Sequence, residues 1–326
     1  MRLNSIELKG HSAMLVASMM WGLMSPISKI IMTSGTISSL LLTNFRIIGA
    51  AIAFWIASVF VKKEHVPHED MLKLFFAAML AILLNQGTFI MGVSLTSPID
   101  ASIVTTTLPM IVMIISALYL REPITGLKVL GLLTGSAGAL LLILSSTNAI
   151  SSANQSGNIG GDLLCLLAQC SYAAYFVLFK DLIGRYSPFT LMKWMFTYAT
   201  IVIVPFSYQE LSTLNPSQLT FNEIGGSLFI VLGATFFAYL LIPIGQHALR
   251  PTVACMYNYV QPIVASIVAI TLGMDHFGIQ KSIAVVLVFL GVYIVTQSKS
   301  RVQIEAQTKD ESSHQTDFNN ESSLYK

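Results

Sequence analysis

Charged residues are scarce in this chain of 326 residues, of which Asp, Glu, Lys and Arg make up only 10%. Soluble domains carry about 25% charged residues, so the composition excludes an ordinary soluble protein. The acidic residues nearest the long apolar stretches lie at or near their ends: Asp100, Glu122, Asp162, Glu223 and Asp275. Because no Asp, Glu or His stands clearly at the centre of such a stretch, the sequence does not support a proton relay through buried carboxylates.

Cysteine and histidine are also scarce, and nucleotide-binding motifs do not occur in the sequence. Cys165, Cys170 and Cys255 stand inside apolar segments and form no paired framework. The six histidines are scattered, so we expect no metal site and no cofactor. The chain has no phosphate-cradling motif, which disfavours an ATP-driven pump. An enzyme would need a nucleophile with a base, or clustered metal ligands, and we expect none because neither pattern occurs in the apolar segments.

Apolar residues are abundant, at 54% of the chain, and the mean hydropathy is +0.70. A membrane-spanning helix needs roughly 20 mostly apolar residues, and a membrane strand would instead alternate in and out. Ten continuous stretches satisfy the helical requirement: about 11–33, 39–61, 71–93, 99–120, 127–146, 161–180, 189–209, 224–246, 251–273 and 279–297. The predicted fold class is an all-α polytopic membrane protein with ten transmembrane helices.

The chain repeats itself. A shift of 153 residues places Pro109 on Pro262, and a shift of 151 places Trp21 on Tyr172. Each copy therefore holds five predicted helices. Because five is odd, the second copy must cross the membrane in the opposite sense to the first, which predicts two inverted-topology five-helix repeats, a recurrent plan of transporters.

The repeats and the charges divide the chain. We expect a cytoplasmic segment at 1–10, a first repeat at 11–147, an outer linker at 148–160, a second repeat at 161–298 and a disordered cytoplasmic tail at 299–326. Lys and Arg concentrate in the tails and in the connections from even to odd helices, whereas Lys281 stands essentially alone on the other side. The positive-inside rule then predicts that both termini are cytoplasmic.

Two long segments carry a family resemblance. GVSLTSPIDASIVTTTLPMIVMIISALYLREPITGLKVLGLLTGSAGALLL and its copy GQHALRPTVACMYNYVQPIVASIVAITLGMDHFGIQKSIAVVLVFLGVYIV resemble EamA-type proteins of the drug/metabolite transporter superfamily. The resemblance extends to MMWGLMSPISK and LLLTNFRIIGAA. It implies a ten-helix carrier of small metabolites, often an exporter, in the plasma (inner) membrane, with a central cavity lined mainly by helices 1, 3, 4, 6, 8 and 9.

Polar and aromatic side chains inside the apolar stretches are the candidate substrate-binding residues, because buried polar groups need partners or face a cavity. The amides could hydrogen-bond a polar solute or simply join helices, and the aromatic rings could form the walls of a pocket or ordinary packing. The candidates are Trp21, Asn85, Gln86, Thr105, Tyr172, Tyr239, Asn258 and Gln261.

Two prolines and four charged residues have other expected roles. Pro109 and Pro262 fall near the middle of predicted helices 4 and 9, where they kink the helix, either for gating or for static packing. Glu122 and Asp275 are expected to cap the helices that follow them. Lys29 can snorkel to the outer surface, and Arg46 serves structure or faces an anionic solute; these four are grouped as structural charges.

The function predicted from these features is a facilitative or secondary carrier of small metabolites, such as amino acids or amphiphilic compounds, working by alternating access. His247 is the residue best suited to proton coupling by its intrinsic pKa. The expected partners are a small-molecule substrate and the bilayer, with no nucleic acid, and glycines such as Gly131 and Gly291 permit close helix contacts or a homodimer. The alternatives are an exchanger of nucleotide sugars or phosphorylated solutes, an intramembrane enzyme and a receptor that does not transport.

Overall fold

The computed structural model describes residues 5–33, 36–95, 104–105, 107–121, 124–147, 159–271 and 279–297. Every regular element within these ranges is a helix. The first copy contains α1 (Ser5–Thr33), α2 (Ser39–Ser58), α3 (His68–Ala78), the π-helix η1 (Met79–Leu84), α4 (Asn85–Leu95), α6 (Leu108–Tyr119) and α7 (Gly126–Thr147).

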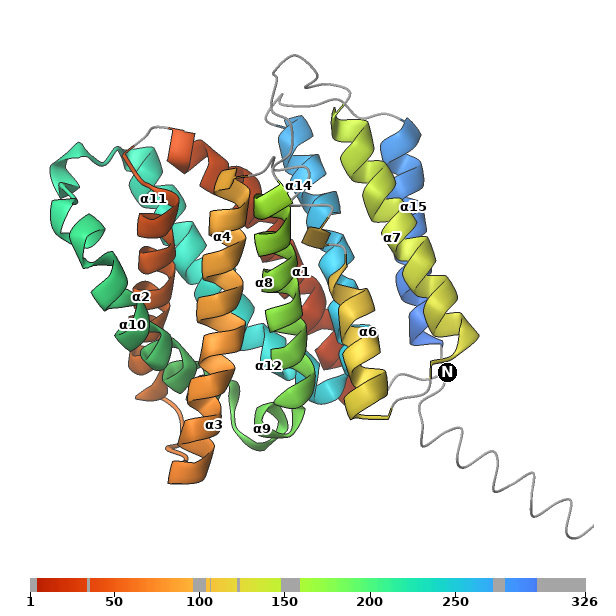
Figure 1. Ribbon diagram of the computed structural model, residues 1–326, viewed down its shortest axis with the longest axis horizontal. Coiled ribbons are helices and arrows are strands. Elements are labelled where there is room, and N and C mark those ends of the chain that lie inside the picture. The colour runs from red at the N-terminus through yellow and green to blue at the C-terminus, as the bar shows by residue number, and fades with distance from the viewer. Residues whose placement is uncertain are drawn as a thin grey trace, which may run out of the picture.

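The second copy begins with α8 (Ile159–Leu178), α9 (Lys180–Arg185), α10 (Pro188–Thr213) and the short 3₁₀ turn η2 (Pro216–Gln218). It continues with α11 (Phe221–Phe229), the π-helix η3 (Ile230–Phe237), α12 (Ala238–Ala248), α13 (Pro251–Met256), the 3₁₀ turn η4 (Tyr257–Tyr259), α14 (Val260–Thr271) and α15 (Ile279–Thr296). The elements stand side by side as a bundle of mostly upright helices (Figure 1).

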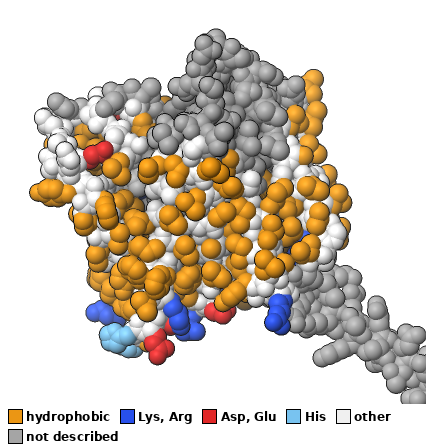
Figure 2. Space-filling model, viewed as in Figure 1, with side chains coloured by type: hydrophobic (Ala, Val, Ile, Leu, Met, Phe, Trp, Pro, Cys, Tyr) orange, Lys and Arg blue, Asp and Glu red, His pale blue; other side chains and the backbone are white. Residues whose placement is uncertain are grey.

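Five of the described helical stretches are long and apolar enough to cross a membrane. They are Ser5–Met32, Ser39–Ser58, His68–Phe89, Pro188–Thr213 and Phe221–Ala248. Two shorter apolar helices, Leu108–Tyr119 and Leu163–Leu178, accompany them. Apolar side chains cover the flank of the molecule in Figure 2, while Lys, Arg and His gather at the end where α9 and the start of α3 lie. This apolar flank fits a multi-pass membrane protein.

Several helix starts follow directly from local sequence. Ser38 caps α2, because its side chain accepts a hydrogen bond from the Leu41 backbone amide. Ser187 caps α10 in the same way, with Pro188 in the first turn. Thr220 and Glu223 form a reciprocal capping box at α11. Each cap satisfies backbone amides that have no partner inside the helix, which fixes where these helices begin.

A π-helical segment interrupts the same helix in both copies. The segment η1 ends at Leu84 and η3 ends at Phe237, positions that the shift of 153 residues makes equivalent. The helices that follow, α4 and α12, also begin and end at equivalent positions under this shift. The duplication seen in the sequence therefore extends to an uncommon backbone conformation, which is often found at functional sites.

The packing between the copies is also repeated. Helix α1 packs against α12, and its counterpart α8 packs against α4, the counterpart of α12. Helices α7 and α15 pack closely against each other at one side of the bundle (Figure 1). A Cβ atom placed on Gly291 would lie 2.6 Å from the Gly131 carbonyl oxygen, so the small residues noted in the sequence allow these two helices of one chain to approach each other.

The two prolines lie at helix interruptions rather than inside uniform helices. Pro109 stands in the first turn of α6, where its missing N–H is harmless. Just before it, the Thr107 amide donates to the Val104 carbonyl, a 3₁₀-type bond. Pro262 lies in α14, four residues after Asn258 in the 3₁₀ turn η4. Because proline has no N–H, Pro262 cannot donate a backbone hydrogen bond to the residue four positions earlier, which lies in this 3₁₀ turn.

Candidate functional site

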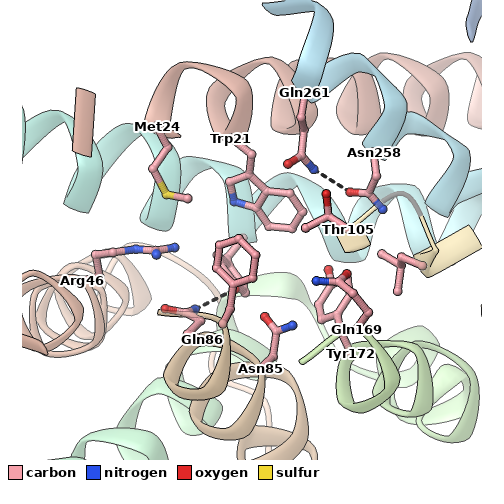
Figure 3. Close-up of a pocket in the computed structure, with 13 residues that line it drawn as sticks. Trp21, Met24, Arg46, Asn85, Gln86, Thr105, Gln169, Tyr172, Asn258 and Gln261 are labelled. Atoms are coloured by element: carbon pink, nitrogen blue, oxygen red, sulfur yellow. Dashed lines mark hydrogen bonds between the residues drawn. The ribbon is translucent and has the colours of Figure 1, made fainter. Parts of the chain in front are cut away.

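One cavity opens between the two copies, lined by α1, α2, α4, α6, α8, α12, η4 and α14 together with Thr105 (Figure 3). All eight residues predicted to bind substrate line this cavity. The lining side chains are Trp21, Met24, Arg46, Asn85, Gln86, Phe89, Thr105, Leu108, Gln169, Tyr172, Tyr239, Asn258 and Gln261.

Residues at equivalent positions of the two copies meet in this cavity. Gln86 and Tyr239, 153 residues apart, share a hydrogen bond in which the Gln86 amide donates to the Tyr239 hydroxyl over 2.7 Å. Trp21 and Tyr172, 151 residues apart, have ring centroids 6.2 Å from each other. The cavity therefore forms where the copies face each other.

Aromatic rings close one side of the cavity. The Trp21 ring meets Tyr239 edge to face, with centroids 5.6 Å apart, and Tyr239 meets Phe196 in the same way at 5.2 Å. Tyr172 continues the layer toward Tyr175, at 5.9 Å. The two edge-to-face pairs of Tyr239 are favourable beyond the area that they bury, so these rings form a packed wall rather than a set of loose side chains.

The π-helix η3 holds two of the lining side chains. The indole N–H of Trp21 donates to the Ala234 carbonyl over 3.0 Å. The Nε of Arg46 donates to the Thr235 hydroxyl over 3.1 Å, and this hydroxyl donates in turn to the Ile230 carbonyl. A π-turn widens the helix and shifts its backbone hydrogen bonds, and here the second copy uses the widened segment to orient side chains of the first.

The corresponding region of the first copy is used in the same sense. The Ser171 hydroxyl of α8 donates to the Leu80 carbonyl in η1. One residue beyond η1, the Asn85 amide donates to the Ala168 carbonyl of α8 over 2.9 Å. Asn85 thus joins two helices and also lines the cavity, and its contact with a solute remains a prediction. Because its nitrogen faces a carbonyl, its oxygen is left available as an acceptor.

The amides on the opposite wall hold each other. Asn258 donates to the Cys255 carbonyl over 3.0 Å, and Gln261 donates to the Asn258 side-chain oxygen over 2.7 Å (Figure 3). The 3₁₀ turn η4 places Asn258 there, since the turn breaks the helix beside the cavity. Gln169, from α8, also lines the cavity and is buried. The cavity therefore offers several neutral hydrogen-bonding groups.

Apart from Arg46, the other predicted residues either lie away from the cavity or fall outside the described part of the chain. His247 is exposed in the last turn of α12, beside Gly184, and does not line the cavity. Pro109 is buried at the start of α6. Glu122, Asp275 and the side chains of Lys29 and Pro262 lie outside the described residues. The capping role of the two acidic residues and the gating role of the prolines remain predictions.

Sequence reasoning missed part of the lining. Met24, Phe89 and Leu108 are apolar residues within apolar stretches. Nothing in the sequence sets them apart from their apolar neighbours. Gln169 carried a usable signal, because it is an amide inside an apolar stretch one turn before Tyr172. Arg46, which we grouped with the structural charges, lines the cavity and also bonds to Thr235.

A second polar cluster lies outside the cavity, where α3 meets the segment after α9. The buried Asp70 accepts hydrogen bonds from Lys73, Arg185 and Tyr186, at 2.8, 2.7 and 2.5 Å. The hydrogen bond to Asp70 raises the pKa of Arg185, and burial together with Asp70 raises the pKa of Tyr186. The bonds from Arg185 and Tyr186 tie the second copy to the first at this end of the bundle.

Comparison with known proteins places this architecture. A family model described as the EamA-like transporter family matches residues 8–144 and again 159–297. The chain belongs to the EamA-like transporter family. The two matches show two EamA-like repeats, and with the apolar helices they identify a multi-pass membrane transporter.

Members of the EamA-like family from distant organisms are similar to this chain. An uncharacterized transporter of Archaeoglobus fulgidus is 26% identical over 73% of this chain and 80% of its own length. A WAT1-related protein of Arabidopsis thaliana is 24% identical over 81% of this chain and 79% of its own. A crystal structure matches with a TM-score of 0.71 at 17% identity, covering 90% of this chain and 96% of the other; this likeness concerns the fold.

Proposed function

We propose that this protein is a secondary or facilitative carrier that moves a small metabolite by alternating access between its two copies. The observation that carries the proposal is the shared cavity, in which equivalent residues such as Gln86 and Tyr239 meet. Carriers built from internal repeats bind their substrate at the interface between the repeats and rock the repeats around it. The proposed substrates are amino acids or amphiphilic compounds, matching neutral amides set beside aromatic rings.

Buried polar atoms support the alternation. The Tyr175 hydroxyl, the Ser116 hydroxyl and the Gln246 side-chain amide are buried without a hydrogen-bond partner among the described residues. Each lies further along its helix than a cavity residue of the same helix, in the direction of the helix end. Unpaired buried polar atoms are costly, so a second state that wets them would regain this free energy. We assign them to the pathway that opens when the cavity closes.

The topology that we propose has ten transmembrane helices in two inverted repeats, with both termini cytoplasmic in a plasma membrane. Support comes from the odd number of helices that the sequence predicts for each repeat and from the Lys and Arg side chains gathered at one end (Figure 2). The positive-inside rule makes that end cytoplasmic. Export is the proposed direction, and it rests on the family resemblance of the sequence.

A carrier fits better than an exchanger of nucleotide sugars or other phosphorylated solutes. Binding a phosphate group usually takes several cationic donors. Among the described residues that line the cavity, Arg46 is the only charged one. A neutral or singly charged solute is therefore better matched.

Counterflow in proteoliposomes tests this function. Vesicles loaded with an unlabelled amino-acid mixture should accumulate labelled amino acids, and Asn258→Ala should abolish this uptake because it removes both amide contacts of the cavity wall. Asn222→Ala, at an exposed position, is the matched control and should transport as the wild type does. Equal transport by Asn258→Ala and the wild type would exclude the cavity as the binding site.

A further arm tests coupling. An imposed pH gradient should drive uptake if protons are coupled, and His247→Gln should then remove the response. A rate that does not depend on the gradient would identify facilitated diffusion or exchange. Absence of counterflow for amino acids, amphiphilic compounds and phosphorylated solutes alike would reject the carrier function.

A further inference from the structure

Arg46 carries a charge into the cavity without a described counter-charge. Its side chain is only 7% exposed, and it extends from α2 toward the space beside Trp21 and Gln86 (Figure 3). One of its nitrogens, Nε, donates to the neutral Thr235 hydroxyl. Neither terminal amino group has a hydrogen-bond partner in the described part of the chain.

A cation buried in this way is unfavourable in the empty protein. Taking a guanidinium out of water costs several kcal/mol unless a counter-charge and hydrogen bonds replace the lost hydration. Thr235 supplies one acceptor and holds the group in place, yet it brings no charge. The described lining residues include no Asp or Glu. Since the described residues supply no negative charge at this point, an occupant of the cavity can bring it.

The shape of the group selects the kind of anion. With Nε engaged, the two terminal amino groups form a planar fork, and such a fork matches the two oxygens of a carboxylate. A single guanidinium balances a single negative charge, which disfavours a phosphate dianion. The charge of the occupant is thus one, and a carboxylate is the fitting group.

The neighbouring side chains describe the rest of the occupant. Trp21 presents an aromatic ring to the same cavity into which Arg46 extends (Figure 3). The Gln86 side-chain oxygen is buried and has no hydrogen-bond partner among the described residues, so it can accept from a donor on the occupant. No described acidic side chain is at hand to pair a separate ammonium group.

We propose that the cavity binds small monocarboxylate anions with an apolar or aromatic body, the carboxylate lying on the Arg46 guanidinium and the body against Trp21. This inference rests on the carrier function proposed above and specifies its substrate class. Thr235 is a positioning residue, because it acts through Arg46. The site recognises the negative charge of the substrate rather than an amino group.

The test compares four probes that share a phenyl ring: phenylacetate, phenylacetamide, phenethylamine and phenylalanine. Binding to the full chain in lipid nanodiscs is measured by titration calorimetry at neutral pH, with empty nanodiscs as the blank for partitioning. Phenylacetate should bind at least about tenfold more tightly than the neutral amide, since hydrogen bonds to a charged group are the stronger ones. Phenylalanine should bind, and phenethylamine should not.

Variants locate the binding. Arg46→Gln should weaken phenylacetate by about tenfold or more and leave phenylacetamide unchanged, which removes the discrimination. Arg46→Lys, which keeps the charge and loses the fork, should retain part of it. Thr235→Val should weaken phenylacetate by a few-fold, and Arg121→Gln, at an exposed cation outside the cavity, should change nothing.

Three results would overturn the assignment. These are equal binding of phenylacetate and phenylacetamide by the wild type, undiminished phenylacetate binding by Arg46→Gln, and no binding of any carboxylate probe. If Arg46→Gln does not fold, the wild-type comparison and Thr235→Val still decide. Counterflow separates the two proposals: transport that Arg46→Gln leaves intact removes the carboxylate assignment and keeps the carrier, whereas absent transport for every solute removes the carrier.

Discussion

The Gln86 amide donates a 2.7 Å hydrogen bond to the Tyr239 hydroxyl, and these two residues are separated by 153 positions, the interval of the duplication. The bond therefore joins one position of the repeat to its own counterpart. Equivalent positions can touch only where the two copies meet, so this bond lies at the interface between the two copies. Both side chains are buried and line the cavity.

The hydrogen bond between Gln86 and Tyr239 should contribute to the free energy of unfolding. Tyr239→Phe leaves the Gln86 nitrogen without its acceptor, and we expect a cost of about 1–3 kcal/mol. Gln86→Leu removes the other partner, and the double variant should be less destabilised than the sum by roughly 0.5–3 kcal/mol. Equilibrium unfolding in mixed detergent micelles measures all four corners of the cycle. Tyr208→Phe, at an exposed ring, controls for the loss of a hydroxyl, and strictly additive values would show that the bond contributes nothing.

The contact between α7 and α15 should tolerate no added methyl group at Gly291. A Cβ atom there would lie 2.5 Å from the Gly135 nitrogen and 2.6 Å from the Gly131 carbonyl oxygen. Both neighbours are backbone atoms that cannot rotate away, so Gly291→Ala should destabilise by about 1–3 kcal/mol through overpacking.

Gly225→Ala is the matched control for this contact, because its added Cβ meets nothing within 4 Å. Gly225 lies within α11, where alanine is favoured over glycine by up to about 1 kcal/mol. Thermal unfolding should therefore move in opposite directions for the two variants. A Gly291→Ala protein as stable as the wild type would refute the close contact.

The Asp70 cluster should depend on charge. Asp70→Asn removes the negative charge that Lys73 and Arg185 share, and we expect a loss of about 1–3 kcal/mol, because these hydrogen bonds are charge-assisted but their cationic ends are half exposed. The loss should shrink at high salt, which screens exposed charges. Asp181→Asn, at an exposed carboxylate of α9, should leave the melting temperature unchanged. A melting temperature of Asp70→Asn equal to that of the wild type in low salt would contradict the cluster.

Glu64 should give the protein an acid-dependent increment of stability. Partial desolvation acts against it, but hydrogen bonds from Thr190 and Ser187 and the charge of Lys193 lower the pKa of Glu64. A group whose pKa is lower in the folded state stabilises above its unfolded value, roughly pH 4.3 for glutamate, and loses that effect as the pH falls through the folded value.

The measurement is the melting temperature of the wild type minus that of Glu64→Gln, followed from neutral pH downward. The difference should be positive at neutral pH and should vanish below the folded pKa. Glu69→Gln, at an exposed glutamate of α3, should show no such trend. A difference that grows as the pH falls would have the wrong sign and would exclude the stabilising role of Glu64.

The sequence predicted the elements of the fold better than their irregularities. Long apolar runs predicted the all-helical class, and the interval between Pro109 and Pro262 predicted the duplication that the two family matches show. The π-helices η1 and η3 were not foreseen, because a shift from one backbone partner to the next leaves no residue signature in apolar stretches such as MLAILL. The 3₁₀ turn at Tyr257 to Tyr259 was not foreseen either, because no residue type in that segment marks where a helix tightens.

The site was predicted where polarity was unusual. Asn85, Gln86 and Asn258 stood out as amides among apolar residues, and the structure brings them to one cavity. Arg46 was harder, because a cation in an apolar helix signals only that it needs a partner, and the direction it faces depends on how α2 packs against η3. Apolar lining residues such as Phe89 depend wholly on such packing.

The matched ends of η1 and η3 also give the two copies the same local irregularity beside the cavity. A π-turn widens its helix and shifts the backbone hydrogen bonds. In each copy it ends directly before the helix that supplies cavity residues, α4 with Gln86 and α12 with Tyr239. Each copy therefore brings its own widened helical segment to its side of the cavity.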